Sequence, residues 1–168
     1  MKMFIEDENG WSEENSIKYS VKQNNEIQKV EFDLKDKNDI KSLRLDPLND
    51  YCIIKINEIR LNNIIYKDFI NTNAFFKEDN LYYFNTDDSQ IYISLPSDIL
   101  IDTFSIEIQY LKIGKDTITD ISNAFSKIFN EKEQNIQKLN QELENRDKSI
   151  ENLRNEVNEK SKIFKKSF

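Results

Sequence analysis

The chain contains no histidine, and this absence limits the chemistry that is open to it. Histidine activates serine and cysteine nucleophiles and is the most common metal ligand, so such sites are excluded in their usual form. Glycine occurs only at positions 10 and 114, which excludes the glycine-rich loops that hold phosphate groups. Carboxylates are plentiful, but no pair of them forms a recognisable catalytic motif. We therefore expect a protein that is not an enzyme and needs no cofactor.

Cysteine occurs once, at Cys52, so a disulfide within the chain is impossible. Its place in the apolar run of residues 52–56 predicts a small side chain in the core. No stretch approaches the roughly 18 apolar residues of a membrane span. The N-terminal segment turns acidic at Glu6, too soon for the apolar region of a secretory signal. Together these features predict a cytoplasmic protein.

The spacing of apolar residues changes at Gly114. Before it, apolar and polar residues alternate with a period of two, which is typical of half-buried strands; after it, the period is that of a helix. This change predicts a β domain over residues 1–114 and a helical segment over 115–168. The β part carries 13 Lys and Arg against 21 Asp and Glu, whereas the helical part is balanced at 11 against 10. An acidic domain without a basic stripe argues against a nucleic-acid partner.

Five stretches of the β part alternate cleanly. Each has one apolar face, expected to be buried and called dry, and one polar face, expected to be exposed and called wet. Such strands are typical of antiparallel sheets packed through one face. A total of seven or eight strands, with no helix between them, predicts a β-sandwich of the jelly-roll or a related type. A slip in the alternation between Ile56 and Ile59 predicts a bulge or tight turn near Asn57 and Glu58. The dry positions are Ile17, Tyr19 and Val21; Val30, Phe32 and Leu34; Leu43 and Leu45; Ile91, Ile93 and Leu95; and Phe104, Ile106, Ile108 and Tyr110.

Two segments of the β part carry a family resemblance. The first runs from Phe4 to Ser16 and contains Asp7, Gly10, Trp11, Ser12 and Glu13; the second comprises Phe32-Asp33-Leu34 and Ile40-Lys41-Ser42-Leu43-Arg44-Leu45-Asp46-Pro47-Leu48-Asn49. They resemble accessory regions attached to bacterial cell-surface polysaccharide glycosyltransferases and methyltransferases, in which a sandwich is also followed by a coiled coil. The resemblance implies an accessory role that involves a glycan. It does not imply transferase activity, because this sequence contains no catalytic domain.

Four residues are candidates for glycan binding. Trp11 follows Gly10 in a segment that enters the sandwich, which favours a buried anchor over a sugar-stacking platform. Tyr92 lies on the wet phase of its strand and is the better candidate for a platform. Arg44 and Asp46 also lie on the wet phase; a cross-strand ion pair that holds the following turn is the preferred interpretation, and ligand contact is the alternative.

Clustered carboxylates leave a calcium site open at Asp87 and Asp88, or around Glu6 to Glu8. The simpler interpretation of each cluster is a solvated acidic turn. The sequence therefore predicts no metal site.

The helical segment predicts a coiled coil. Thr117 to Asp120 resembles a capping box, with Asp116 as the competing N-cap, and neither Gly nor Pro interrupts the next fifty or so residues. In the heptad frame that places Phe129 at a, every later a position is apolar, whereas the d positions alternate between apolar and basic residues. The frame shifts by a stutter near Phe129. The residues expected to form the interface are Phe129, Ile136, Leu139, Leu143, Arg146, Ile150, Leu153 and Val157.

An isolated helix would leave this apolar stripe in water, so we expect self-association. Apolar β-branched residues at several a positions with Leu at d favour a parallel dimer, in which Arg146 meets Glu142 or Asp147 of the other chain. The alternative is a helix that folds back on its own sandwich. The basic C-terminal tail is expected to be a solvated helix end rather than a membrane contact.

Two functional hypotheses from different classes follow. The first is a non-catalytic accessory protein of cell-surface polysaccharide biosynthesis, whose sandwich binds or positions a glycan or a glycosyltransferase while the coiled coil oligomerises it. The second is a structural spacer or assembly protein of a phage or a cell envelope, with no ligand. Exposed Trp11 and Tyr92 rings beside a concave face would favour the first, and a flat polar sheet would favour the second.

Overall fold

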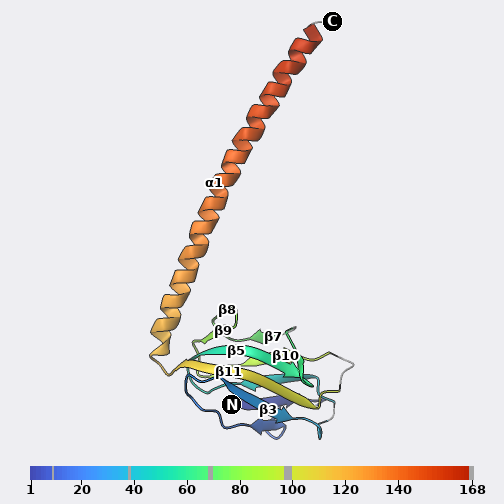
Figure 1. Ribbon diagram of the computed structural model, residues 1–168, viewed down its shortest axis with the longest axis vertical. Coiled ribbons are helices and arrows are strands. Elements are labelled where there is room, and N and C mark those ends of the chain that lie inside the picture. Colours follow the sequence, from blue (N-terminus) through green and yellow to red (C-terminus); the bar gives the residue numbers. More distant parts are fainter. Residues whose placement is uncertain (9, 38, 68–69, 97–99, 167–168) are drawn as a thin grey trace. The chain divides into compact units, whose positions relative to one another are not determined.

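The computed structural model describes residues 1–8, 10–37, 39–67, 70–96 and 100–166, with helical side chains described up to residue 162. The described chain forms a two-layered β-sandwich followed by one long helix, α1 (Thr117–Lys166), as the sequence predicts (Figure 1). The strands are β1 (Lys2–Glu6), β2 (Ser16–Lys18), β3 (Gln28–Asp33), β4 (Ser42–Asp46), β5 (Cys52–Leu61), β6 (Ile64–Ile65), β7 (Ile70–Thr72), β8 (Phe76–Glu78), β9 (Leu81–Phe84), β10 (Ile91–Ser94) and β11 (Thr103–Ile113).

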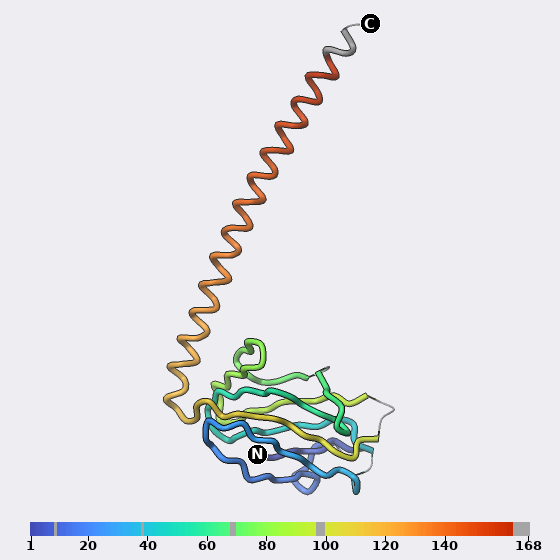
Figure 2. The backbone as a smooth tube through the Cα atoms, viewed as in Figure 1, coloured from blue at the N-terminus to red at the C-terminus, as the bar shows by residue number. Residues whose placement is uncertain are grey.

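The two sheets are antiparallel throughout their described pairings. One has the order β2-β1-β4-β10-β7, and the other has the order β3-β11-β5-β9-β8 with β6 also beside β5. From β2 to β5, and again from β9 to β11, each strand lies in the opposite sheet from the one before it, which is the alternation of a jelly roll. Figure 2 traces the path of the backbone from the N-terminus (dark blue) through the sandwich to the helix (orange to red).

The core lies between the sheets and is built by every second residue of the facing strands. Side chains of consecutive strand residues point to opposite faces, so the alternation in the sequence becomes one buried and one outer face. Buried positions that the alternation predicts include Val30, Phe32, Leu34, Leu43, Leu45, Ile91, Ile93, Phe104, Ile106, Ile108 and Tyr110. Cys52 is also fully buried, as its place in the apolar run predicts.

The predicted bulge is present in the pairing of β5 with β11. Ile108 pairs with Ile56 and Glu107 pairs with Glu58, so Asn57 is the extra residue between them. This extra residue lets both Ile56 and Ile59 face the core despite their odd separation. A slip in the alternation of the sequence therefore located this irregularity correctly.

Two strand predictions at the N-terminal end were incomplete. The strand expected to carry Ile17, Tyr19 and Val21 ends at Lys18, and Tyr19 is exposed rather than buried. The alternation did not reveal β1, because Met3, Phe4 and Ile5 read as one short apolar run. This strand nevertheless pairs on both sides, with β2 and with β4, and Met3 and Ile5 are fully buried.

The helix begins differently from the predicted capping box. The amides of Thr117 and Ile118 donate to the carbonyl oxygens of Gly114 and Lys115, at 2.9 and 3.1 Å. The Thr117 hydroxyl is buried and has no hydrogen-bond partner among the described residues, so it does not cap the helix. Gly114 takes a positive φ of 93°, which suits the sharp change of direction after β11.

The chain divides into two compact units, and the first extends from Met1 to Asn123. The first helical turns therefore belong with the sandwich, where Thr117 and Ile121 are buried and Lys112 of β11 forms an ion pair with Asp120. The second unit begins at Ala124 and consists of the rest of α1. In the described part of the chain no helix is long and apolar enough to span a bilayer.

Candidate functional site

The sequence-predicted candidates lie on one surface, the outer face of the sheet β2-β1-β4-β10-β7. Phe4 of β1, Arg44 of β4 and Tyr92 of β10 are direct neighbours across the strands, because Phe4 pairs with Arg44 and Arg44 pairs with Tyr92. Their strand neighbours Leu43, Leu45, Ile91 and Ile93 point inward and are fully buried. We call the surface formed by Phe4, Trp11, Arg44, Asp46 and Tyr92 the aromatic face.

Arg44 and Asp46 form a two-pronged ion pair on this surface. The Nε and Nη2 atoms of Arg44 donate to Oδ1 and Oδ2 of Asp46 at 2.9 and 3.0 Å. The pair was expected to cross between strands, and this detail is wrong: both residues belong to β4. Residues two apart on a strand share a face, which puts the two side chains in contact without a neighbouring strand.

Phe4 is the member of the aromatic face that the sequence did not identify. The Arg44 guanidinium lies 4.0 Å from the centre of its ring, and the ammonium group of Lys2 lies 4.4 Å from it. Only 5% of Phe4 is exposed, although it belongs to the outer face. Lys2 is held in turn by an ion pair with Glu13. Two cations therefore cover the Phe4 ring, and each has its own carboxylate partner.

The loop between β1 and β2 carries Trp11 to the same surface. Asp7 and Gly10 form an isolated bridge, and Gly10 adopts a φ of 85°, a conformation that glycine accepts without strain. The side-chain amide of Asn15 donates to the carbonyl oxygen of Ile5 at 3.1 Å and holds the end of the loop against β1.

The Trp11 ring meets the Tyr92 ring edge to face, with their centres 6.3 Å apart. The Arg44 guanidinium carbon lies 5.8 Å from the centre of the Trp11 ring. Trp11 and Tyr92 are both half-buried. The burial of Trp11 is therefore intermediate between the buried anchor and the open platform that the sequence left as alternatives. Each residue thus keeps part of its surface accessible.

A chain of hydrogen bonds connects Tyr92 to the loop before β10. The Tyr92 hydroxyl donates to the side-chain oxygen of Gln90, and the Gln90 amide donates to a carboxylate oxygen of Asp88 at 2.9 Å. This chain links the aromatic rings to the acidic turn at Asp87 and Asp88.

Two loops are tied together beside the aromatic face by a buried serine. Ser89 is fully buried, and its hydroxyl donates to the carbonyl oxygen of Leu48 at 2.6 Å and accepts from the Leu48 amide at 3.3 Å. This contact fixes Asn49, in the loop after β4, relative to Asp87 and Asp88. These two loops and the neighbouring strands border an open cavity of about 450 Å³. It is lined by Lys2, Phe4, Glu13, Arg44, Asp46, Asn49, Asp87 and Asp88.

The electrostatics of the cavity follow from its burial and its ion pairs. Burial raises the pKa of Asp46, and the hydrogen bonds from Arg44 oppose this effect only in part. The hydrogen bond from Lys2 lowers the pKa of the exposed Glu13 carboxyl. Within the described ranges, no group of three or more Cys, Asp or Glu side chains is placed to hold a metal ion.

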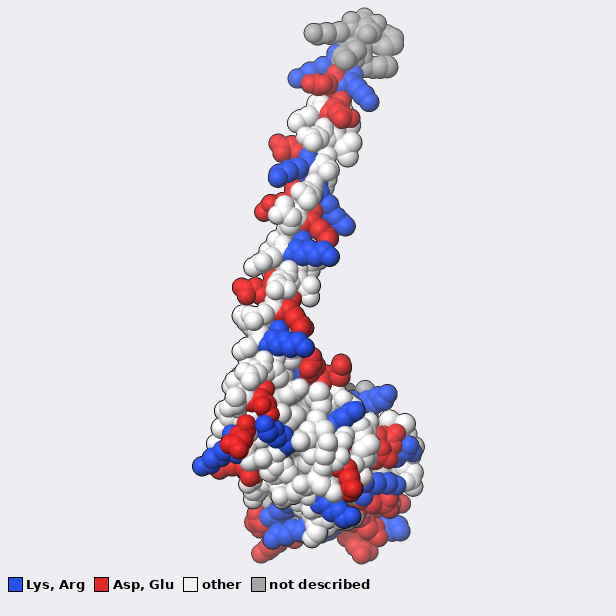
Figure 3. Space-filling view, turned by 60° about the vertical axis from the view of Figure 1, so that its left-hand side comes forward, with Lys and Arg blue, Asp and Glu red and all other residues white. Residues whose placement is uncertain are grey.

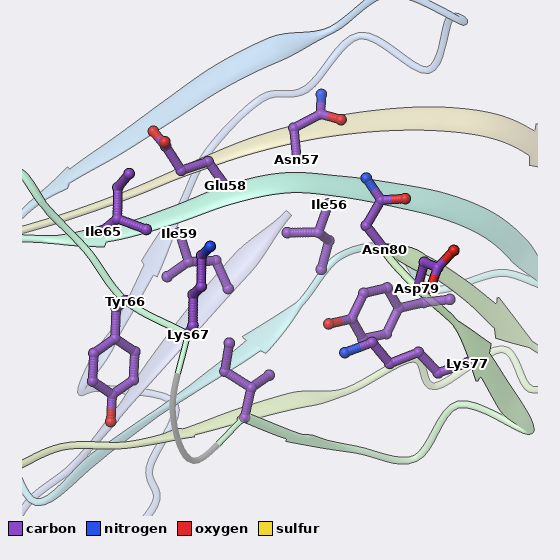
Figure 4. Close-up of a pocket in the computed structure, with 12 residues that line it drawn as sticks. Ile56, Asn57, Glu58, Ile59, Ile65, Tyr66, Lys67, Lys77, Asp79 and Asn80 are labelled. Carbon is purple, nitrogen blue, oxygen red and sulfur yellow. The ribbon is translucent and has the colours of Figure 1, made fainter.

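A second cavity, of about 360 Å³, lies on another part of the sandwich and contains none of the predicted site residues (Figure 4). Its apolar lining includes Ile56 and Ile59 of β5, and Lys67, Lys77 and Asp79 contribute charged side chains. Its residues come from four separate segments of the chain, so no local sequence pattern identifies them as a group.

The predicted interface residues of the helix are all exposed within the single chain. The exposed fractions of the apolar ones range from 47% at Ile150 to 65% at Val157. Arg146 is also exposed. The second unit thus carries an apolar stripe that the other described residues of this unit leave uncovered.

Comparison of the chain with protein-family models, curated proteins and solved structures finds no match.

Proposed function

We propose that the sandwich is a non-catalytic glycan-binding domain and that the aromatic face with its adjoining cavity is the binding surface. The observation that carries this proposal is the convergence of Trp11, Arg44, Asp46 and Tyr92 from three separate segments on one outer face. Sugar recognition combines the apolar faces of the rings with polar groups that bond hydroxyls. The aromatic face and the cavity offer both within one surface.

The charges of the cavity favour an uncharged glycan over an acidic one. Lys2 is paired with Glu13, and Arg44 is paired with Asp46, so neither cation is free to bind an anion. The remaining charged groups are the exposed carboxylates of Asp87 and Asp88, beside the amide of Asn49. These groups accept hydrogen bonds from sugar hydroxyls and repel uronic or phosphorylated sugars.

The sequence resemblance supports a place for this domain in cell-surface polysaccharide biosynthesis. In this role the sandwich holds a glycan, or a glycosyltransferase that acts on it, without reacting itself. We propose that α1 joins copies of the chain through its exposed apolar stripe, since an uncovered stripe of this length is stabilised by a second helix. Joined copies would bind a repeating polymer more tightly than one copy does.

A glycan array followed by titration calorimetry tests the binding proposal. Trp11→Ala and Tyr92→Ala should each weaken binding of the array's hits by about tenfold or more, since each removes an aromatic contact. Tyr19→Ala is the matched control, because Tyr19 is an exposed aromatic residue outside the aromatic face. An array without hits, or hits unaffected by both substitutions, contradicts the proposal.

One observation favours the second candidate, a structural spacer without a ligand. The polar groups of Arg44 and Asp46 satisfy each other, and Phe4 is covered, so the centre of the face is stable without a ligand. If the protein is such a spacer, Arg44→Ala should lower the stability of the sandwich, and no glycan should bind to the protein without this substitution.

A further inference from the structure

The exposed stripe of α1 contains cations as well as apolar residues. Along residues 129–160 the a positions are Phe129, Ile136, Leu143, Ile150 and Val157, and the d positions are Lys132, Leu139, Arg146, Leu153 and Lys160. All ten residues are exposed in the single chain. Figure 3 shows the mixed surface that results, with blue and red side chains among white ones along the helix. The orientation of a partner helix decides what each cation meets.

A parallel dimer in register places each residue of the stripe opposite its own copy. Lys132, Arg146 and Lys160 would then each face an identical cation in the core of the interface. The flanking positions add a further repulsion, because Glu142 at g would face Asp147 at e of the second chain. Apolar a positions with Leu at d favour this arrangement, but the charges oppose it.

An antiparallel dimer removes these like-charge contacts. If a twofold axis crosses the pair between Glu144 and Asn145, each a residue faces a d residue of the second chain. Four of the resulting layers are wholly apolar, because Leu139 faces Ile150 and Ile136 faces Leu153, each twice. The three basic d residues face Leu143, Val157 and Phe129 of the second chain, so no two cations meet.

The flanking charges also agree with the antiparallel arrangement. Arg146 lies beside Glu142 of the second chain, and Lys132 lies beside Glu156, because g positions of antiparallel helices flank the facing d positions. At the opposite edge Glu133 lies beside Arg154 of the second chain. The twofold axis repeats each pair, which gives six complementary contacts along the seam.

From this complementarity we infer that α1 binds a second copy of itself as an antiparallel two-stranded coiled coil centred between Glu144 and Asn145. The inference rests on the proposed self-association and specifies its partner, orientation and register. The two Asn123 residues, at which the first units of the two chains end, then lie at opposite ends of the paired segment. They are roughly 65 Å apart at 1.5 Å per residue. One dimer would present its two glycan-binding domains from the two ends of a rod.

Disulfide trapping tests the orientation directly. Leu139→Cys and Ile150→Cys are made separately, and the chains are oxidised singly and as a mixture; the native Cys52 is buried and does not take part. The antiparallel dimer gives a crosslink between the two variants in the mixture and none in either variant alone. A parallel dimer gives the reverse, because each cysteine then faces its own copy, and this result overturns the inference.

Charge reversal at position 142 tests the register, because it should weaken an antiparallel dimer and strengthen a parallel one. Glu142→Lys places the new lysine beside Arg146 of an antiparallel partner and should weaken dimerisation about tenfold through two repulsive contacts. In a parallel dimer the same change replaces the repulsion with Asp147 by an attraction and strengthens dimerisation. Glu144→Lys is the matched control, since it changes the charge equally on the outer side of the helix.

The double variant Glu142→Lys with Arg146→Glu should restore the antiparallel dimer, because it exchanges the two charges of the pair. Failure of this rescue overturns the proposed register. A chain that is monomeric at all concentrations in light scattering overturns the inference together with the proposed self-association. A dimer with the parallel crosslinking pattern overturns the inference alone.

Discussion

The hydroxyl group of Tyr110 donates a hydrogen bond of 2.9 Å to the carbonyl oxygen of Pro47 in the interior of the sandwich. Tyr110 belongs to β11 of one sheet, and Pro47 directly follows β4 of the other. The bond therefore joins the two layers next to the loop that carries Asn49. Burial raises the pKa of Tyr110, which keeps the hydroxyl protonated as the donor.

Tyr110→Phe should destabilise the protein by about 1–3 kcal/mol, because it leaves the buried Pro47 carbonyl without a partner. Urea unfolding followed by circular dichroism measures this change. Tyr19→Phe, at an exposed position, should alter the free energy of unfolding by less than about 0.5 kcal/mol. Equal effects from the two substitutions would show that the bond between the layers contributes nothing.

Alkaline pH should destabilise the protein through Cys52. Burial raises the pKa of its thiol from 9.0 to about 12, so the unfolded chain loses this proton at a lower pH than the folded chain. The stability that this group contributes is fully present below pH 9 and is lost as the pH rises toward 12, by up to about 1.4 kcal/mol per pH unit. Urea unfolding between pH 8 and 11 measures the slope, and Cys52→Ala should make it shallower. An unchanged slope would contradict the assignment to Cys52.

Thr117→Val should leave stability unchanged or raise it by up to about 1 kcal/mol. The Thr117 hydroxyl is buried without a hydrogen-bond partner among the described residues, and valine keeps the shape while removing the polar atom. Thermal unfolding compares this variant with Thr119→Val, whose side chain is exposed. A clear loss specific to Thr117→Val would mean that the hydroxyl does cap the helix.

Changing Leu143 and Ile150 together to Asp should abolish self-association without unfolding the sandwich. Both side chains are exposed in the single chain, and both belong to the unit that begins at Ala124. Light scattering should show a monomer, and circular dichroism should retain the signal of the sheets. Loss of the sheet signal would mean that the sandwich depends on the stripe.

Arg146→Leu should raise the melting temperature of the dimer. The substitution replaces a charge that the interface would partly desolvate with an apolar side chain, and it completes the apolar seam between Leu139 and Leu153. It should also weaken the control of register and strand number, which crosslinking after the substitution would reveal. A lower melting temperature would mean that Arg146 forms an ion pair worth more than the apolar contact.

The sequence by itself determined the class of fold and much of its detail. Alternating residues located the dry faces of four strands, the slip near Asn57 located the bulge of β5, and the change of period at Gly114 located the end of the last strand. These features follow from side-chain geometry along a strand or a helix, so a few adjacent residues are enough to reveal them. The wet phase of Arg44, Asp46 and Tyr92 likewise predicted that their side chains lie on outer faces.

Only the tertiary structure decided which outer positions meet. Phe4 lies beside Arg44, and Arg44 beside Tyr92, because β1, β4 and β10 pair in one particular register. Each of these pairings joins residues far apart in the chain, and its free energy depends on the packing of the whole core against the entropy of closing the loops. The strand β1 was missed for the same reason. Its short apolar run has no period of its own, and pairing with two distant strands makes it a strand.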